Sequence, residues 1–564
     1  MAGAGRAGPP EGVVGTRGTG AALVLAAAAA FYLHALGRAP LLEPDEGRYA
    51  SLGRSILATG DWIVPRLNGV VYAQKPPLGY WATAAAYRAF GVDERSARLV
   101  PALAGVVTVG TTLAFAARTF GPAVGLGAAA VLATTPLFFV FARLAILDVP
   151  FTCWLAAACL ALYRLLDAGR ARGAWTVAAG VALGGAVLTK GLAGLALPLG
   201  VAAASALVER TPARIGRLAV PALIAVGLAV PWSVAVEARV PGFLRHLVVQ
   251  HHVTRFAVGG KIGHAHYPGY LVPIFVGGAL PWAIAGAVGA WRTGAGWWRR
   301  PEARLERWCA LWILVVLGFF SASRLQIATY VAPAFPPLAI LVARLWPAGA
   351  RAMLRAWGAA AAVVLLLALA PREAAHAVVS RILYPRWWEE AEAVRALLLP
   401  AAAAAAAGAA LGLAALRRGR PGAALAVTAA TLAVGLALVE PARGAFESCR
   451  ALGGILRARA AEADRVVVYG RFLQGLPFYA RRRTAVVGPP GSLEFGAGRA
   501  DARHILWSER RLVRSWNRGR RIFLVVRPKD WRVLRKRLRR PPTVLAAEHG
   551  RVLMTNAPLG APLR

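Results

Sequence analysis

The sequence predicts a polytopic α-helical membrane protein with a small α/β domain at its C-terminal end. The chain of 564 residues is 58% hydrophobic with a mean hydropathy of +0.53, whereas soluble proteins are nearer half apolar. Apolar runs of about 18 residues or more recur along it, and each is long enough to cross a bilayer core of about 30 Å. After about residue 441, short runs typical of strands replace the long ones.

About thirteen spans are expected, and a first span that remains uncleaved is among them. Its apolar run continues to about Leu36 without a convincing signal-peptidase site. Tyr80, Trp81 and Tyr87 suit headgroup depth, so the segment 78–93 is expected to be a further short helix along the interface. The expected spans are 20–38, 97–117, 121–140, 147–166, 174–188, 190–208, 217–237, 269–290, 306–322, 327–345, 352–370, 398–415 and 421–440.

Arginine clusters in alternate connections predict the orientation of the chain. The even-numbered connections are short and basic, as in Arg417, Arg418 and Arg420, whereas the odd ones are long or sparsely charged. The positive-inside rule therefore predicts a cytoplasmic N-terminus, and an odd span count places the C-terminus outside. Five segments with ionisable residues then share the outer face: the first loop 39–96, Arg143–Asp148, Thr189–Gly191, the loop 239–268 and Ser323–Tyr330.

Residues 441–564 are expected to form the extracytoplasmic α/β domain, and residues 1–440 the transmembrane domain. Helix-like segments at Glu509–Trp516 and Asp530–Leu538 alternate with the strand-like runs, which is typical of a small α/β fold. The expected strands are Val466–Tyr469, Thr484–Val487, Ile505–Trp507, Ile522–Val526 and Thr543–Leu545.

The net charge of +40 does not indicate nucleic-acid binding in this chain. All but five of the 66 basic residues are arginine, which with the abundant Ala and Gly indicates a compositional bias, and many lie at cytoplasmic loop positions. The four cysteines lack paired spacing, and Cys153, Cys159 and Cys309 lie in or beside apolar spans. A disulfide framework and a cysteine zinc site are therefore not expected.

The first outer loop holds the strongest candidates for chemistry. Asp45 and Glu46 follow Pro44 and are candidate catalytic residues, because acidic residues at a membrane face are costly unless they are paired or functional. A solvated loop start or a helix N-cap is the plain alternative. On a helix Arg48 shares a face with Asp45, which fits either a structural ion pair or a carboxylate beside a phosphate-binding guanidinium. Lys75 precedes two prolines and suits a phosphate as a point charge, or it snorkels at the interface.

Four further positions border apolar runs on the same predicted face. Arg143 and Asp148 bracket a short apolar segment, either as a helix-end salt bridge or with Asp148 as a second acidic group of the site. Lys190 lies between two spans and either snorkels or serves the site. Tyr330 begins the outer end of a span, where an aromatic-belt role is the plain alternative.

The loop 239–268 is rich in ligand-type residues, but their spacing does not match a known zinc motif. Contacts of these histidines with phosphate or lipid headgroups are the favoured interpretation, and no metal site is assigned. The residues concerned are His246, His251, His252, Arg255, Lys261, His264 and His266.

Several motifs in order resemble the 4-amino-4-deoxy-L-arabinose lipid A transferases and, more broadly, the GT-C glycosyltransferases related to protein O-mannosyltransferases. The motifs are Asp45–Ala50, Gly60–Gly69, Lys75–Trp81 and Phe90–Pro101, with weaker similarity at Arg143–Asp148, Thr189–Gly191, His252–Phe256 and Phe320–Pro333. Members of this group have about thirteen spans and a C-terminal extracytoplasmic domain, in agreement with the count above.

The resemblance implies the GT-C fold and an inverting transfer of sugar from a polyprenyl-phosphate donor to a lipid, glycan or protein acceptor on the outer face. It implies a catalytic role for Asp45, with Arg48 and Lys75 at the donor phosphate and Arg255 and Tyr330 elsewhere in the donor site. No nucleotide and no metal cofactor is strictly required, although a divalent metal is an open alternative. The implied location is the bacterial inner membrane, with lipid A modification and protein mannosylation as the implied cell-envelope processes.

Two departures and one rival function complete the expectations. Gln326 stands where many relatives have Lys, and His251 stands where a Glu-His pair often begins, so the sugar and the acceptor are left open. A transporter or flippase would place ionisable residues at mid-bilayer depth in repeated halves. The charges here crowd one face and no repeat is visible, which favours the transferase.

Overall fold

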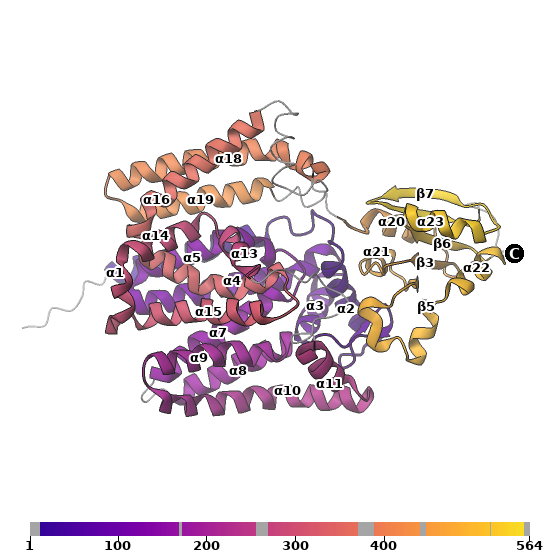
Figure 1. Ribbon diagram of the computed structural model, residues 1–564, viewed down its shortest axis with the longest axis horizontal. Coiled ribbons are helices and arrows are strands. Elements are labelled where there is room, and N and C mark those ends of the chain that lie inside the picture. Colours follow the sequence, from indigo (N-terminus) through magenta and orange to yellow (C-terminus); the bar gives the residue numbers. More distant parts are fainter. Residues whose placement is uncertain are drawn as a thin grey trace, which may run out of the picture.

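A computed structural model describes residues 12–167, 172–254, 269–369, 388–439, 447–518 and 520–557. Figure 1 shows a bundle of long helices beside a smaller domain that contains a sheet, with α2 (Asp45–Thr59) and α3 (Leu78–Phe90) between them. The predicted first outer loop therefore forms the layer that separates the two parts. Its remaining elements are the two short antiparallel strands β1 (Arg66–Leu67) and β2 (Val70–Val71).

The helices of the bundle begin and end where the sequence carries the expected signals. The side chain of Asp93 accepts a hydrogen bond from the Ser96 N–H at the start of α4, and Gly121 with φ +92° separates α4 from α5. The helices of the bundle are α1 (Gly12–Leu33), α4 (Glu94–Phe120), α5 (Pro122–Thr134), α6 (Pro136–Ala142), α7 (Asp148–Asp167), α8 (Arg172–Lys190), α9 (Ala193–Val208), α10 (Ala219–Arg239), α13 (Leu271–Gly278), α14 (Trp282–Thr293), α15 (Arg304–Ala322), α16 (Phe335–Leu369), α18 (Trp388–Arg417) and α19 (Pro421–Val439).

The described residues contain seven helices that are long and apolar enough to cross a membrane, or nine if each of two bent pairs counts as one span. This is fewer than the thirteen spans expected from the sequence. The predicted span 121–140 is broken by a 67° bend between α5 and α6, and the predicted span 269–290 by a 101° bend between α13 and α14. Proline follows each break, at Pro136 and Pro281, because its ring cannot continue the preceding helix.

One further difference concerns the late spans. The expected spans 327–345 and 352–370, with a connection between them, are replaced by the single 35-residue helix α16, which contains Pro347. Helices α1 and α9 contribute only short apolar stretches, at Thr19–Leu33 and Ala193–Val208. Hydropathy thus locates the apolar helices, but it overestimates the number of spans because it does not detect bends, short helices or the continuity of α16.

The C-terminal domain is built on a six-stranded mixed sheet with the strand order β5-β4-β3-β6-β8-β7. β3, β4, β5 and β6 run parallel, and β7 and β8 add an antiparallel pair. All five predicted strands are confirmed, while β8 was not predicted. The strands are β3 (Arg465–Tyr469), β4 (Ala485–Val487), β5 (Leu506–Trp507), β6 (Ile522–Val526), β7 (Thr543–Glu548) and β8 (Arg551–Thr555).

Helices on the sheet follow the predicted alternation. The two predicted helical segments correspond to α22 (Glu509–Asn517) and α23 (Pro528–Leu534), the latter extended by a 3-10 turn at Arg535–Arg537. The remaining helices are α20 (Arg450–Arg459) and the short α21 (Leu476–Ala480). Fully buried Val467, Leu524 and Trp516 show that the sheet has its own apolar core.

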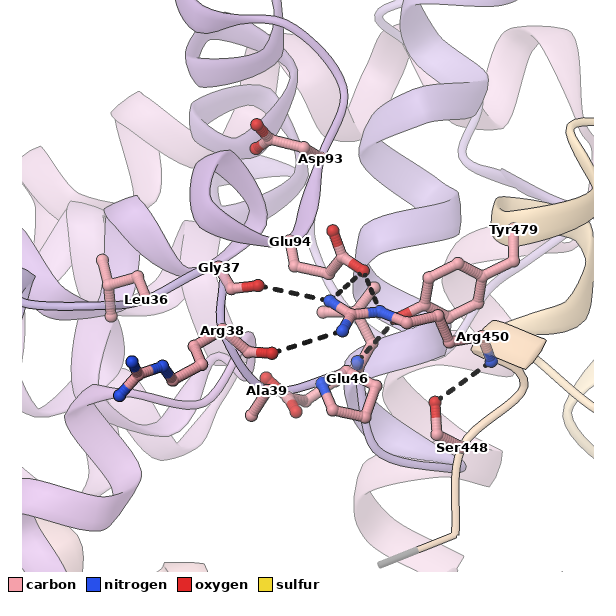
Figure 2. Close-up of polar contacts among 12 residues, drawn as sticks. Leu36, Gly37, Arg38, Ala39, Glu46, Asp93, Glu94, Ser448, Arg450 and Tyr479 are labelled. Atoms are coloured by element: carbon pink, nitrogen blue, oxygen red, sulfur yellow. Dashed lines mark hydrogen bonds and ion pairs between the residues drawn. The ribbon is translucent and has the colours of Figure 1, made fainter. Parts of the chain in front are cut away.

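Polar contacts of the first-loop layer hold the C-terminal domain on the bundle. Figure 2 shows the Arg450 guanidinium beside Glu94, at 2.6 Å, while it also donates to the backbone carbonyls of Gly37 and Arg38. Asn68 exchanges two hydrogen bonds with the backbone of Thr484, at 2.7 and 2.9 Å. Because these contacts join the two domains at separate points, they fix the shape of the cleft between the domains.

Candidate functional site

A cleft of about 890 Å³ lies where the first-loop layer, the π-helical segment His246–Thr254 and the C-terminal domain meet. Two of the five segments that the sequence placed on one face, the first loop and the loop 239–268, therefore meet at this cleft. The other three meet one another, because Lys190 pairs with Asp148 and lies over the ring of Tyr330. Polar and charged side chains from both domains line the cleft: Arg48, Gln74, His246, Gln250, His251, Arg471, Gln474, Ser492, Glu494 and Arg527.

Asp45 and Arg48 form the predicted pair at the start of α2. The helix begins at Asp45 after Pro44, where an acidic first turn suits the positive end of the helix dipole. The carboxylate of Asp45 lies 3.0 Å from the Arg48 guanidinium, and the Asp45 side chain is 54% exposed against 17% for Arg48. Arg48 also donates to Gln474 Oε1 of the C-terminal domain at 2.5 Å. Asp45 is therefore an accessible carboxylate beside a cation that lines the cleft.

Glu46, the next residue, lies in a different environment. Its side chain is 2% exposed, and both carboxylate oxygens accept hydrogen bonds from the Arg98 guanidinium at 2.7 and 2.8 Å. The backbone N–H groups of Leu42 and Ala145 donate to the same carboxylate. This geometry describes a structural group that ties α2 to the bundle, so the predicted catalytic role of Glu46 has no support in its surroundings.

Asp148 and Lys190 lie together although 42 residues separate them. Lys190 Nζ is 2.5 Å from Asp148 Oδ1, and both side chains are at most a tenth exposed. The Lys190 ammonium lies over the ring of Tyr330, 5.1 Å from its centroid, and the Tyr330 ring stacks on Phe320 at 4.3 Å. The sequence singled out these three residues separately, and the structure brings them into one buried cluster. Arg143 instead donates to the carbonyls of Phe31 and Tyr32.

Of the remaining predicted residues, the structure describes Lys75 but not the last part of the loop 239–268. Lys75 is half-buried in the segment between β2 and α3, next to Gln74 of the cleft wall. Arg255, Lys261, His264 and His266 lie outside the described residues. Within the described ranges, no group of three His, Cys, Asp or Glu side chains is arranged to hold a metal ion.

Electrostatics in the cleft favour a cationic Arg48 and a neutral His246. Burial lowers the pKa of Arg48, but the interactions with Tyr72 and Asp45 outweigh it, so the net pKa is raised. Burial likewise lowers the pKa of His246. Burial raises the pKa of the neighbouring Tyr49 and Tyr80 well above the usual value, which keeps both phenols neutral.

Glu43 is a residue beside the cleft that sequence reasoning missed, and it ties the first-loop layer to the C-terminal domain. Its carboxylate accepts hydrogen bonds from the backbone N–H groups of Gln474 at 2.9 Å and Gly475 at 2.5 Å, at the end of the segment that follows β3. Burial raises the pKa of Glu43, an effect that these two N–H donors oppose. A third acidic residue within four positions of Asp45 was the only signal in the sequence, and it does not reveal a partner more than 400 residues away.

Gln326, one of the departures from the resembled family, has a local structural role. It is buried, and its Nε2 donates to the carbonyls of Ser321 and Ser323 at 3.1 and 3.2 Å. These bonds shape the turn between α15 and Tyr330. The substitution thus supports the loop that positions the ring over Lys190.

Comparisons with protein families match both parts of the chain. Residues 74–234 match the family described as dolichyl-phosphate-mannose-protein mannosyltransferase. Residues 454–556 match the family described as aminoarabinose transferase C-terminal domain. The two matches fall on opposite sides of the cleft.

Curated relatives include two undecaprenyl phosphate-alpha-4-amino-4-deoxy-L-arabinose arabinosyl transferases from Pseudomonas. The protein from Pseudomonas fluorescens is 33% identical over 317 residues, which is 55% of each chain. The protein from Pseudomonas aeruginosa is 35% identical over 326 residues, which is 57% of this chain and 58% of the relative. The chain thus spans about half the length of the curated relatives it matches.

Solved structures show similarity over nearly the whole chain. The crystal structure of ArnT from Cupriavidus metallidurans bound to undecaprenyl phosphate superposes with a TM-score of 0.83 at 26% identity, covering 96% of this chain and 99% of that one. The apo structure of the same protein gives a TM-score of 0.82. The chain is thus similar in overall fold to a solved ArnT, and its two parts match a protein mannosyltransferase family and an aminoarabinose transferase family.

Proposed function

We propose that this protein is an integral-membrane glycosyltransferase that moves a sugar from a polyprenyl-phosphate donor to an acceptor on the outer face of the membrane. The observation that carries the proposal is the accessible Asp45 carboxylate, held 3.0 Å from Arg48, which itself lines the cleft between the two domains. The named activity of the relatives makes undecaprenyl phosphate the first donor lipid to test, with 4-amino-4-deoxy-L-arabinose as the first sugar.

The reaction that suits this geometry is an inverting displacement at the anomeric carbon. The bond between that carbon and the phosphate oxygen breaks, and the phosphate keeps the electron pair. An acceptor oxygen forms the new bond from the opposite face of the sugar. Arg48 and Lys75 would stabilise the negative charge that develops on the departing lipid phosphate, because fixed cations are most effective in a site with little water.

Asp45 would act on the acceptor. Where the acceptor is a hydroxyl group, the Asp45 carboxylate takes its proton as the new bond forms. Where the acceptor is already an oxyanion, no base is needed, and Asp45 instead orients Arg48 and the acceptor. In both cases the proton balance closes without a metal or a nucleotide.

Asp148, Lys190 and Tyr330 form a second cluster that would serve the donor. The ammonium of Lys190 is held by Asp148 and by the ring of Tyr330, and so its direction is fixed before a substrate arrives. A preorganised cation of this kind suits a phosphate or a sugar hydroxyl. Arg255 would belong to the same donor site by family resemblance alone.

The proposed setting is the bacterial inner membrane, with the cleft and the C-terminal domain on the extracytoplasmic side. The arginine-rich connections at the opposite end of the spans support this orientation. The acceptor would be a lipid, a glycan or a protein of the cell envelope.

Mass spectrometry of lipids and envelope glycans tests the proposal directly. Extracts are compared from cells with the gene, without it, and with Asp45→Asn in its place. We expect one glycosyl increment to be lost in both the deletion and the Asp45→Asn strain, which identifies sugar and acceptor together. An unchanged glycan profile with a lipid or solute retained on one side of the membrane would instead establish a transporter.

A further inference from the structure

The carboxyl edge of the C-terminal sheet faces the cleft, and its strand order carries information about ligands. The order β5-β4-β3-β6 places β3 at the point where successive connections diverge to opposite sides. In open parallel sheets, ligands bind in the crevice outside the carboxyl ends of the strands at such a switch point. The residues that directly follow β3 and β6 therefore lie where such a ligand would bind.

An arginine follows each of these two strands and lines the cleft. Arg471 comes one residue after Gly470, which succeeds β3, and Arg527 succeeds β6 directly. Gly470 has φ +93°, and a side chain there would meet the carboxylate of Asp530 and the guanidinium of Arg527 at 3.4 and 3.7 Å. These are ordinary contact distances, so the positive φ is what favours glycine here, and the end of β3 lies directly beside Arg527.

The two arginines differ in their local partners. Arg527 donates to Asp530 Oδ2 at 2.8 Å, which fixes its direction. The Arg471 side chain is exposed, and within the part of the chain that the structure describes it forms no ion pair. On the facing wall Arg48 is engaged by Asp45 and Gln474, and Glu494 is the acidic residue among the lining side chains. On the C-terminal wall, the guanidinium of Arg471 is therefore available to bind an anionic ligand.

The backbone at the same edge already has an anionic partner. The N–H groups of Gln474 and Gly475 donate to the carboxylate of Glu43, which comes from the first-loop layer. A ligand at this edge is thus bound by the arginine side chains and not by these N–H groups. The Glu43 contact also holds the β3 segment, and with it Arg471, against the cleft.

We propose that the carboxyl edge of the C-terminal sheet is the acceptor-binding wall of the cleft, with Arg471 binding an oxyanion of the acceptor and Arg527 completing the wall. The inference rests on the proposed transferase function and deepens it. Arginine suits this role because its planar guanidinium binds phosphate or carboxylate oxygens in pairs. Arg471 would determine which acceptors enter, whereas the donor phosphate is left to Arg48 and Lys75.

Binding of inorganic pyrophosphate to the purified full-length protein, measured by isothermal titration calorimetry in detergent, tests the site without turnover. We expect Arg471→Gln to weaken pyrophosphate binding by about tenfold, since a bidentate charged contact is lost. Arg518→Gln, an exposed arginine of the same domain that does not line the cleft, serves as the matched control and should bind like the parent.

Saturation with undecaprenyl phosphate separates the two sources of an oxyanion. The acceptor wall predicts that pyrophosphate still binds when undecaprenyl phosphate occupies the donor site. Displacement by undecaprenyl phosphate would assign Arg471 to the donor and overturn the inference. Failure of the parent to bind pyrophosphate, or equal binding by Arg471→Gln, would overturn it as well. Each of these results leaves the glycan profile of the gene deletion, and hence the proposed function, to be judged separately.

Discussion

Asp45 and Glu46 are neighbours in the sequence, yet they belong to two opposite kinds of charged region. The Asp45 side chain is about half exposed, and it pairs with the guanidinium of Arg48, which lines the cleft. Glu46 is enclosed by the Arg98 side chain and two backbone N–H groups, which use both of its oxygens. A carboxylate with unused hydrogen-bond acceptor positions can accept a proton or bind a substrate. A buried carboxylate whose oxygens are both hydrogen-bonded instead holds structural elements together.

The difference shows that an acidic pair near a membrane face need not act as a pair. The helix that begins at Asp45 turns consecutive residues by about 100°, so the Glu46 carboxylate is buried against the bundle while the Asp45 carboxylate stays accessible beside Arg48. We therefore expect two conservative substitutions to have opposite effects: Asp45→Asn should lower activity, and Glu46→Gln should lower stability.

Asp45→Asn should have the largest effect on transfer. The substitution keeps the shape of the side chain but removes its charge and its basicity, and we expect the rate to fall by about 100- to 10,000-fold. Thermal unfolding in detergent should be nearly unchanged because the Asp45 side chain is largely exposed. Transfer at the parental rate by a folded Asp45→Asn protein would remove Asp45 from the chemistry and end the contrast with Glu46.

Glu46→Gln should reverse this pattern. The Arg98 guanidinium would remain buried without a counter-charge, and breaking a buried pair in this way costs about 3–5 kcal/mol. We therefore expect a lower unfolding temperature and a lower yield of folded protein. The folded fraction should transfer sugar at nearly the parental rate per molecule, measured after size-exclusion chromatography. A stable Glu46→Gln protein that has lost activity would show that Glu46 is catalytic after all.

The buried pair of Asp148 and Lys190 lies between these two extremes. Lys190→Met alone leaves an uncompensated carboxylate, whereas Asp148→Asn combined with Lys190→Met removes both charges and should recover most of the lost stability. If Lys190 serves the donor, the double variant should be folded yet remain about 100-fold slower, as expected for the loss of one preorganised electrostatic group. Recovery of both stability and transfer would assign the pair to structure only.

The sequence predicts local features of this site well. Apolar run lengths identify most helices, and short β-type runs identify five of the six strands of the C-terminal sheet. The three-residue spacing of Asp45 and Arg48 predicts their ion pair. All of these depend on residues that are close along the chain. The bends at Pro136 and Pro281 and the continuous helix α16 escape prediction because proline both breaks helices and is tolerated within them.

The contacts that separate structural from accessible acids depend on residues far apart in sequence. Glu46 meets Arg98 across 52 positions, Asp148 meets Lys190 across 42, and Glu43 meets Gly475 across 432. No nearby sequence feature indicates that the Glu46 carboxylate is fully hydrogen-bonded while the Asp45 carboxylate stays accessible. The folded arrangement alone distinguishes them, which is why the sequence assigned a catalytic role to both.

Lys75→Ala should have the smallest effect of these substitutions. Lys75 is half-buried next to Gln74, which lines the cleft. We expect its loss to raise the KM for the polyprenyl-phosphate donor by about tenfold, because one of several charged contacts to the phosphate is removed. The kcat should change little. Lys75→Arg should restore part of the affinity, and Lys536→Ala, at an exposed position of the C-terminal domain, is the control for loss of a lysine. Initial rates at varied donor concentration provide the measurement.

An unchanged donor KM would mean that Lys75 only contacts the interface, and the phosphate would then depend on Arg48 and the buried Lys190. A large fall in kcat instead would place Lys75 at the reacting atoms, next to Asp45.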